Sequence, residues 1–340
     1  MLKPYIAKIM GRKHLSEEEA ETAMELMMTG QATPAQIGGY LVALRMKGET
    51  VAEITGSARA MRKQATQLTV SDGSQQLFDT AGTGGDGAHT FNISTAAAFV
   101  LAGSGRKVAK HGNRAASSQC GSADVLAALG INLNLTAEQV AACIDQVGIG
   151  FLFAPSFHPA MKHAIGPRRE LGQRTIFNIL GPLTNPAGAT HQLIGVYDSS
   201  LTQPLAEVLG ALGGRAAYVV HGHGGLDELT TSGPNRVSRL RDGRVTTFEL
   251  DASALGLRPA SKRHLVGGDP QKNARMLWAL LAGQDDSPRR DVVLLNAAAA
   301  LATEDDNFSS ALEEATLSLE SGAALAKLDA LVGFSQQMVQ

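Results

Sequence analysis

The chain has 340 residues, of which 44% are hydrophobic, 18% are charged and 37 residues are glycine. This is the composition of a folded globular protein, and it excludes disordered and fibrous chains. Thirty Lys and Arg residues against 32 Asp and Glu residues give a net charge of −2, and aromatic residues make up only 4%. These values argue against a basic nucleic-acid-binding surface and against base stacking on aromatic side chains. Any phosphate chemistry must therefore be local.

The length suits about two domains of ~150 residues each. The two cysteines, Cys120 and Cys143, cannot form a disulfide framework, and neither belongs to a C-x-x-C pair. No signal peptide is visible, and apolar runs such as 292–302 are shorter than the roughly 18 residues that a membrane span needs. We expect a cytoplasmic protein with no membrane partner.

The first seventy residues predict helices only. Apolar residues recur at helical spacing over 20–27, 37–44 and 54–61. Thr33 and Thr50 begin capping boxes ahead of the second and third of these segments, and Pro34 stands at a first helical position. Three short amphipathic helices are therefore expected to form an opening helical unit.

The pattern changes after a turn cluster at residues 71–74. Short apolar runs then alternate with glycine-rich loops and helices. The expected strands lie at 76–78, 107–109, 193–197 and 217–220, and the expected helices at 95–101, 123–129 and 201–212. This alternation predicts an α/β unit with a mostly parallel sheet, whose ligands bind at the carboxyl ends of the strands.

The loop after the first expected strand reads G-T-G-G-D-G at residues 82–87 and matches G-x-G-x-x-G. A dinucleotide site would also require an acidic residue about 20 positions later, where residues 106–110 are instead basic. A dinucleotide site is thus disfavoured, and a plain glycine-rich turn remains an alternative. Asn92, Ser94 and Thr95 follow at the start of a helix, where they either cap the helix or form an anion cradle.

A second polar loop, K-H-G-N-R-A-A-S-S-Q-C-G-S at 110–122, again separates a strand from a helix. Two such loops at successive strand ends suggest a ligand with two phosphate groups. No Walker A sequence occurs, so a nucleoside-triphosphate P-loop is unsupported.

Asp227 and Glu228 follow the expected strand at 217–220. Adjacent carboxylates at a strand end suit a magnesium ion that bridges to phosphate oxygens, although they would equally suit the start of a helix. His221 and His223 lack the further ligands that a zinc site requires.

Arg168 lies in a basic run whose guanidinium groups suit a ligand carboxylate; the alternative is a solvated helical face with an Arg–Glu pair. Cys143 lies on an apolar helical stripe and is expected in the core. Cys120 lies in the second loop without an evident base, and we do not expect it to be a nucleophile.

Taken together, these stretches resemble the anthranilate phosphoribosyltransferase family of tryptophan biosynthesis. The matching segments, in order, are G-T-G-G-D-G-A-H-T-F-N-I-S-T, K-H-G-N-R-A-A-S-S-Q-C-G-S-A-D, H-P-A-M-K, R-R-E-L-G-Q-R-T-I-F-N-I-L-G-P-L-T-N-P and L-D-E-L-T. Each motif alone is modestly specific, whereas the ordered set, which covers nearly the whole chain, is highly specific.

The resemblance implies a small helical domain and a larger α/β domain of the nucleoside phosphorylase/phosphoribosyltransferase type. The helical domain would take in residues 1–72 and a returning segment at about 166–188, and the α/β domain residues 73–165 and 189–340. It also implies a homodimer formed through the helical domains. The reaction would transfer phosphoribosyl from phosphoribosyl pyrophosphate (PRPP) to the amine of anthranilate, releasing pyrophosphate, with two magnesium ions per active site.

The resemblance also assigns site residues. For PRPP these are Gly82, Gly85, Asp86, Thr90, Asn92, Ile93, Ser94, Thr95, Lys110, His111, Gly112, Asn113, Arg114, Ala115, Ala116, Ser117, Ser118 and Ser122. For anthranilate they are Gly82, Asn113 and Arg168, and for magnesium Ser94, Asp227 and Glu228. His111 is a candidate proton acceptor, and no other catalytic residue is assigned. Cys120 departs from the serine common in the family, and we expect it to touch none of the assigned residues.

Two other functions remain alternatives. A pyrimidine nucleoside phosphorylase has the same fold, but it uses inorganic phosphate without paired magnesium carboxylates, so Asp227 and Glu228 argue against it. A non-catalytic nucleic-acid-binding relative would be expected to have a basic surface and degenerate phosphate loops, and this chain has a net charge of −2.

Overall fold

The computed structural model describes residues 1–71, 76–115 and 118–338. Most of the expected turn cluster, the expected domain boundary between residues 72 and 73, and the assigned residues Ala116 and Ser117 lie outside the described residues.

Four helices open the chain: α1 (Lys3–Met10), α2 (Glu17–Met28), α3 (Pro34–Lys47) and α4 (Val51–Gln64). The three predicted helices are confirmed, and the capping boxes at Thr33 and Thr50 form as the sequence indicates. The first helix, α1, was not predicted. Its Tyr5, Ile6 and Ile9 recur at helical spacing and pack in or against the core of the helical unit, a signal that the sequence analysis did not use.

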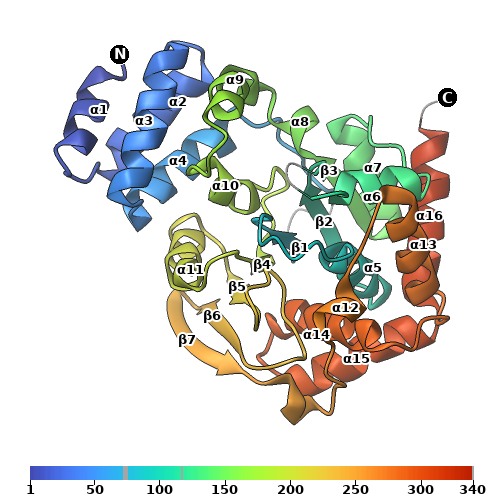
Figure 1. Cartoon of the computed structure of the whole chain (residues 1–340). Helices are drawn as coiled ribbons and strands as arrows, with labels where there is room; N and C mark the ends of the chain where they lie inside the picture. The colour runs from blue at the N-terminus through green and yellow to red at the C-terminus, as the bar shows by residue number, and fades with distance from the viewer. Residues whose placement is uncertain (72–75, 116–117, 339–340) are drawn as a thin grey trace.

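A later segment returns to this helical unit. After the sheet strand β3 (Ile149–Phe153) come α8 (Ala154–Phe157), the 3-10 helix η1 (Pro159–Met161), α9 (Lys162–Leu171), α10 (Phe177–Leu180) and the 3-10 helix η2 (Gly181–Leu183). Helix α9 contacts α2 and α3, and α10 contacts α4. Ala164, Phe177 and Leu180 share a hydrophobic core with Met24 and Leu41. Figure 1 shows α9 and α10 beside the blue N-terminal helices.

Within the described residues, seven strands form one sheet in the order β3-β2-β1-β4-β5-β6-β7. The other strands are β1 (Leu77–Gly82), β2 (Lys107–Gly112), β4 (His191–Gly195), β5 (Ala216–His221), β6 (Asn235–Arg241) and β7 (Arg244–Leu250). Strands β1 to β5 pair in parallel, and β6 and β7 pair antiparallel, so the predicted mostly parallel sheet is confirmed. β1 lies between β2 and β4, which places Gly82 beside Gly195 at the carboxyl edge.

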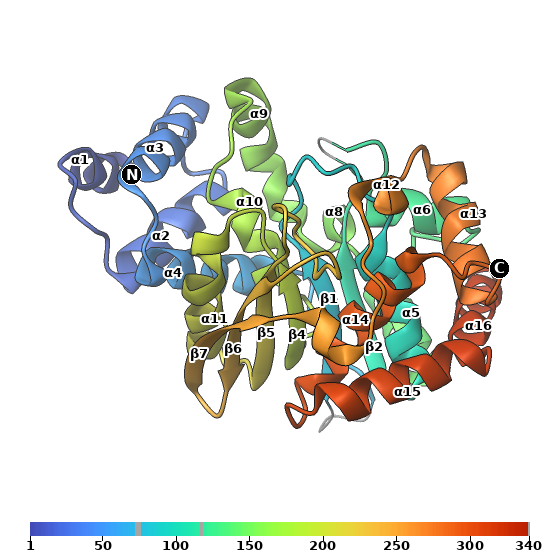
Figure 2. The same cartoon turned by 60° about the horizontal axis from the view of Figure 1, so that its bottom comes forward.

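Helices cover the sheet on both faces, as Figures 1 and 2 show. The remaining elements are α5 (Ile93–Gly103), α6 (Ser122–Ala128), α7 (Ala137–Val147), η3 (Ser199–Leu201), α11 (Thr202–Ala211), η4 (Ala252–Leu255), α12 (Lys262–Leu265), α13 (Pro270–Leu281), α14 (Pro288–Ala302), α15 (Phe308–Glu320) and α16 (Ala323–Gln337). Helix α5 is nearly all apolar, α14 carries the apolar runs 292–295 and 297–302, and both helices are largely buried in the largest core. Cys143 is 1% exposed there, which confirms its expected core position.

None of the described helices is both long and apolar enough to span a bilayer.

Candidate active site

Four loops follow the carboxyl ends of parallel strands and meet at one edge of the sheet. The loop 83–92 joins β1 to α5, the loop 113–121 joins β2 to α6, and the loop 222–234 joins β5 to β6. The fourth, after β4, carries Tyr197. Because β1 is flanked by β2 on one side and β4 on the other, these loops lie at the place where open α/β sheets commonly bind ligands, in the crevice beyond the strand ends.

The carboxylates of Asp227 and Glu228 join the loop after β5 to the loop after β1. The backbone N–H of Gly84 donates to Asp227 Oδ2 at 2.7 Å, and that of Ser94 donates to Glu228 Oε1 at 3.1 Å. Asp227 N in turn donates to Asp86 Oδ2 at 3.4 Å. Four of the residues assigned to PRPP and magnesium are thereby brought together.

No helix begins at Asp227 and Glu228. The chain runs irregularly from there to β6, so the alternative in which the two carboxylates start a helix is wrong. Their charges instead lie beside the N-terminus of α5, where free backbone N–H groups favour anions.

Glycines allow this close crossing of loops. A Cβ atom on Gly195 would lie 1.5 Å from the carbonyl oxygen of Asp227, and one on Gly222 would lie 2.1 Å from that of Glu228. A Cβ on Gly82 would lie 2.9 Å from Asp227 Oδ2. Any side chain at Gly195 or Gly222 would therefore displace the carboxylate loop.

The electrostatics of this cluster are unbalanced. Burial, together with the neighbouring Asp86 carboxylate, raises the pKa of Asp227. Burial and the charge of Asp227 raise the pKa of Glu228, while Lys110 acts in the opposite direction. Burial lowers the pKa of Lys110, whose Nζ donates to Thr80 O at 2.5 Å and lies 3.4 Å from Ser94 Oγ. Negative charge exceeds positive charge at this point.

The donor set fits a hard divalent cation. Ser94, Asp227 and Glu228 offer only oxygen ligands, which magnesium prefers, and the raised pKa values of both carboxyl groups show that positive charge would be stabilising there. Magnesium typically takes one or two protein carboxylates and completes its shell with phosphate oxygens and water.

The loop 113–121 is organised by Asp124, a residue that the sequence analysis did not select. Asp124 Oδ2 accepts from the backbone N–H groups of Ala115 and Gly121, both at 2.9 Å, and Oδ1 accepts from Arg114 Nη1 at 2.8 Å. Ser122 Oγ donates to Asn113 O at 3.3 Å and closes the loop at the start of α6. One carboxylate three residues into the next helix therefore anchors both described ends of the predicted phosphate loop, at 114–115 and at Gly121.

The contacts of Cys120 differ from those expected from the sequence. Its carbonyl accepts a hydrogen bond from Asn92 Nδ2 at 3.2 Å, and its Sγ lies 3.5 Å from Asn92 Oδ1. The expectation that Cys120 touches none of the assigned residues was wrong, because the loops after β1 and β2 meet at this point. Burial raises the pKa of the Cys120 thiol to about 11, so the thiol is neutral and is not a nucleophile.

His111 lies at the end of β2 in a buried pocket. Its Nδ1 lies 3.2 Å from the carbonyl oxygen of Gly181, which can only accept, so Nδ1 carries the proton and Nε2 is an acceptor. The ring centroid of His158 is 5.2 Å away. Burial and His158 lower the pKa of His111 to about 3, and burial lowers that of His158 to about 4. Both Nε2 atoms are buried without a hydrogen-bond partner in the described part of the chain.

Arg168 lies on α9, in the returning segment. Its guanidinium packs 4.9 Å from the Phe177 ring centroid, and burial lowers its pKa. Among the described residues no carboxylate pairs with Arg168, so the alternative of an Arg–Glu pair on this helical face does not hold for Arg168. An unpaired, partly buried guanidinium is available to a ligand carboxylate.

The structure does not bring Arg168 into contact with the carboxylate cluster. The segment after α9 does reach the loop after β1, since Arg174 hydrogen bonds to Gly85 O and its guanidinium lies 4.1 Å from the Tyr197 ring centroid.

Other residues assigned to PRPP lie near the same carboxyl edge of the sheet, and their burial and contacts differ. Thr90 forms an isolated β-bridge with Val266, and Ile93 is 1% exposed and belongs to the core. Thr95 Oγ1 is buried near the start of α5, where the described residues provide no partner. Gly112 ends β2, and Ser118 is exposed on the loop beyond it.

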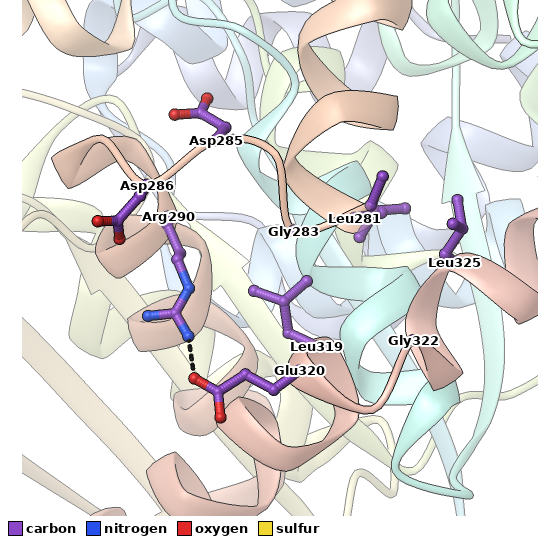
Figure 3. Close-up of a pocket in the computed structure, with 10 residues that line it drawn as sticks. Leu281, Gly283, Asp285, Asp286, Arg290, Leu319, Glu320, Gly322 and Leu325 are labelled. Atoms are coloured by element: carbon purple, nitrogen blue, oxygen red, sulfur yellow. Dashed lines mark hydrogen bonds and ion pairs between the residues drawn. The ribbon is translucent and has the colours of Figure 1, made fainter.

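A separate cavity of about 430 Å³ lies between the α13–α14 connection and the turn between α15 and α16. Arg290 and Glu320, 2.6 Å apart, form an ion pair at its wall (Figure 3). Of the residues assigned to substrates, none that the structure describes lines this cavity.

Two family models match the chain. Residues 3–65 match the helical bundle domain of a glycosyl transferase family, and residues 74–325 match the a/b domain of that family. The anthranilate phosphoribosyltransferase of Moorella thermoacetica is 56% identical over 336 residues, with 98% of each chain covered. That of Symbiobacterium thermophilum is 54% identical over 339 residues, with 99% of this chain and 98% of its own covered.

Solved structures agree with the sequence relatives. The anthranilate phosphoribosyltransferase of Thermus thermophilus superposes with a TM-score of 0.92 at 43% identity, covering 97% of this chain and 99% of its own. That of Saccharomyces cerevisiae in complex with PRPP and Mg gives a TM-score of 0.89 at 29% identity, covering 99% of this chain and 98% of its own. This chain is therefore a member of the anthranilate phosphoribosyltransferase family.

Proposed function

We infer that the chain is a magnesium-dependent anthranilate phosphoribosyltransferase. It transfers the phosphoribosyl group of PRPP to the amine of anthranilate and releases pyrophosphate, a step of tryptophan biosynthesis. The observation that carries this conclusion is the joining of two predicted loops, in which Asp227 and Glu228 bind the backbone of Gly84 and Ser94. A pyrimidine nucleoside phosphorylase would have no use for this pair of carboxylates.

The leaving group determines what the protein must supply. Breaking the bond between the anomeric carbon and pyrophosphate builds negative charge on pyrophosphate and positive charge on the ribose, so catalysis depends on positioning and charge stabilisation. The backbone N–H groups of the loop 83–92, the N-terminus of α5 and the ammonium of Lys110 would hold the phosphate oxygens. We propose an inverting displacement with oxocarbenium character.

Magnesium, when bound, would neutralise the phosphate charge that these groups leave uncompensated. Ser94, Asp227 and Glu228 would hold it. A count of two ions per site, with Ser94 and Glu228 at one and both carboxylates at the other, is part of the proposal and is supported by the two adjacent acidic side chains.

Anthranilate would meet the other side of the crevice. Arg168 supplies an unpaired guanidinium for its carboxylate, and Asn113 and Gly82 would contact it near the strand ends. The aromatic amine is a nucleophile at neutral pH, so no strong base is required. His111 is only a weak candidate for the acceptor of its proton, because its Nε2 is buried without a partner among the described residues and its pKa is lowered to about 3.

The molecular organisation is also part of the proposal. Residues 1–72 with the segment 166–188 would form a helical domain, and residues 73–165 and 189–340 the α/β domain; the shared core of α9 and α10 with α2 and α3 supports this division. We propose a homodimer formed through the helical domains, supported by Met10, Val42 and Met46, which are 72%, 40% and 75% exposed there. The net charge of −2 supports the absence of a nucleic-acid partner.

We propose a cytoplasmic location, since both cysteines are unpaired, as is usual in a reducing compartment.

The test is the loss of anthranilate fluorescence on mixing the protein with PRPP and magnesium, for the wild type and for an Asp227→Asn/Glu228→Gln variant. We expect the variant to be slower by at least about 100-fold, because charge stabilisation of the leaving group is lost. A Glu313→Gln/Asp329→Asn variant removes the same charges from exposed positions and should retain activity.

A folded wild-type protein that leaves anthranilate fluorescence unchanged would overturn the proposed function. Phosphorolysis of a pyrimidine nucleoside in its place would establish the phosphorylase alternative.

A further inference from the structure

The start of α13 lies against the loop between β1 and α5, although the two are far apart in the sequence. Phe91 N donates to Leu265 O at 2.8 Å, and Gly267 N donates to His89 O at 2.9 Å. A Cβ atom on Gly267 would lie 2.9 Å from Phe91 N and 2.8 Å from Asn273 Oδ1. The segment before α13 is therefore packed directly on the loop that leads into Asn92.

Asn273, in the first turn of α13, is 1% exposed and sits between this segment and Asn92. Its Oδ1 accepts from Gly268 N at 2.7 Å, and its Nδ2 donates to Asn92 Oδ1 at 3.0 Å. Asn92 Nδ2 then donates to Cys120 O at 3.2 Å. A chain of three hydrogen bonds thus runs from α13 through Asn92 to the loop after β2.

The direction of this chain is fixed at both ends. A backbone N–H can only donate, so the Asn273 atom that faces Gly268 must be Oδ1, and the atom that faces Asn92 must be Nδ2. A backbone carbonyl can only accept, so Asn92 must present Nδ2 to Cys120. Asn92 is allowed only one of its two amide orientations.

We propose that Asn273 is a positioning residue for the phosphate site: it holds the Asn92 amide with its NH₂ group toward the loop 113–121. Asn92 then ties the loops after β1 and β2 together through one N–H and directs its second N–H, for which the described residues provide no acceptor, toward the anionic substrate. This role rests on the proposed function, in which those two loops bind PRPP.

Asn273→Asp would reverse the orientation of the Asn92 amide with almost no change in side-chain shape. The carboxylate keeps its acceptor for Gly268 N but places an oxygen opposite Asn92 Oδ1. Asn92 is then driven to turn its amide over, which presents an oxygen to Cys120 O and to the phosphates. Losing one such hydrogen bond and gaining a repulsion corresponds to about a ten-fold change in binding.

The first experiment measures steady-state kinetics of the wild type and Asn273→Asp with each substrate varied. We expect the KM for PRPP to rise about ten-fold, with kcat and the KM for anthranilate within about two-fold of the wild type. A KM for PRPP that stays within about two-fold in a folded variant would overturn the proposal.

A double-mutant cycle separates positioning from general destabilisation. If Asn273 acts through Asn92, Asn273→Ala should raise the KM for PRPP in the wild type but have no further effect in an Asn92→Ala background. Equal effects of Asn273→Ala in both backgrounds would show a merely structural role and would sink the proposal. Thermal unfolding of all four proteins identifies any variant that fails to fold.

These outcomes are distinct from failure of the proposed function. An inactive but folded wild type would contradict the transferase assignment itself. An active wild type with an unaffected Asn273→Asp variant would contradict only the role of Asn273.

Discussion

His111 and His158 form a buried pair of neutral imidazoles at the end of β2, next to the predicted phosphate loop. The ring centroids are 5.2 Å apart, and burial is the main cause that lowers both pKa values. His158 lies in the quoted H-P-A-M-K segment, yet the sequence analysis gave it no role. Its relation to His111 arises only when β2 and the chain after β3 come together.

The depressed pKa values predict sensitivity to acid. An unfolded histidine has a pKa of about 6.5, so between about pH 6.5 and pH 4 the unfolded chain binds more protons than the folded one, and the free energy of unfolding falls as pH falls. From pH 7.5 to pH 5.0 each residue should remove about 2 kcal/mol.

Urea unfolding of the wild type and His158→Asn at both pH values tests this prediction. The loss on acidification should be about 2 kcal/mol smaller in the variant. An identical loss in both proteins would show that His158 is protonated in the folded state at pH 5.0.

At the scale of elements, the end of β4 determines whether the carboxylate loop can reach the loop after β1. Gly195 pairs with Gly82 at this edge, and the chain at Asp227 passes directly over it. The backbone of Gly195 lies outside the left-handed region, so the requirement for glycine is one of space and not of conformation.

Gly195→Ala should therefore impair catalysis more than folding. The added methyl would lie 1.5 Å from Asp227 O, so the loop must shift, and a shift of about 1 Å near the reacting groups costs on the order of 100-fold in rate. Steady-state activity over a range of magnesium concentrations measures the effect.

Gly333→Ala is the matched control, because no atom lies within 4 Å of a Cβ atom at that helical position. Wild-type activity in Gly195→Ala would mean that the loop accommodates the methyl without moving its carboxylates.

The elements that the sequence predicted are those with a local signal. Thr33 and Thr50 identify helix starts through their own neighbours, and the apolar run of α5 is unmistakable. The hairpin of β6 and β7 was not predicted, although Asp242-Gly243 is a hairpin signal. Much of β7 is exposed, so it lacks the apolar run by which β1, β2, β4 and β5 were found; β3, although apolar and buried, was also not predicted.

The candidate site was likewise predictable only where neighbouring residues in the sequence carry a signal. The loops after β1, β2 and β5 are visible as glycine-rich and polar stretches, and the resemblance gave their residues roles. Asp124 and Asn273 were not predicted to belong to the site, because their partners are backbone groups or distant amides and no local sequence pattern indicates such contacts. Contacts of this kind depend on the tertiary fold.

At the scale of the whole molecule, the exposed apolar residues of the helical unit predict assembly. Val42 and Met46 lie one turn apart on α3, and Met10 lies on α1, which contacts α3. An apolar surface of this kind on a folded protein is typical of a protein–protein interface.

A Val42→Glu/Met46→Glu variant should therefore be monomeric where the wild type is dimeric, because two buried charges per subunit would be unpaired in the interface. Sedimentation equilibrium gives the masses directly. A Leu317→Glu variant is the control, since Leu317 is 67% exposed on α15, far along the chain from the helical unit. A wild-type monomer would contradict the proposed homodimer.

The strand order also determines when the site can exist during synthesis. β1 pairs with β4, more than a hundred residues later, and the cluster around Ser94 needs Glu228. A nascent chain that ends before β5 can form local helices and the β1–β2–β3 pairing but lacks the Asp227 and Glu228 carboxylates that would hold magnesium beside the phosphates. Substrate can therefore stabilise only the completed sheet, and PRPP added during refolding would slow unfolding without accelerating the early steps of folding.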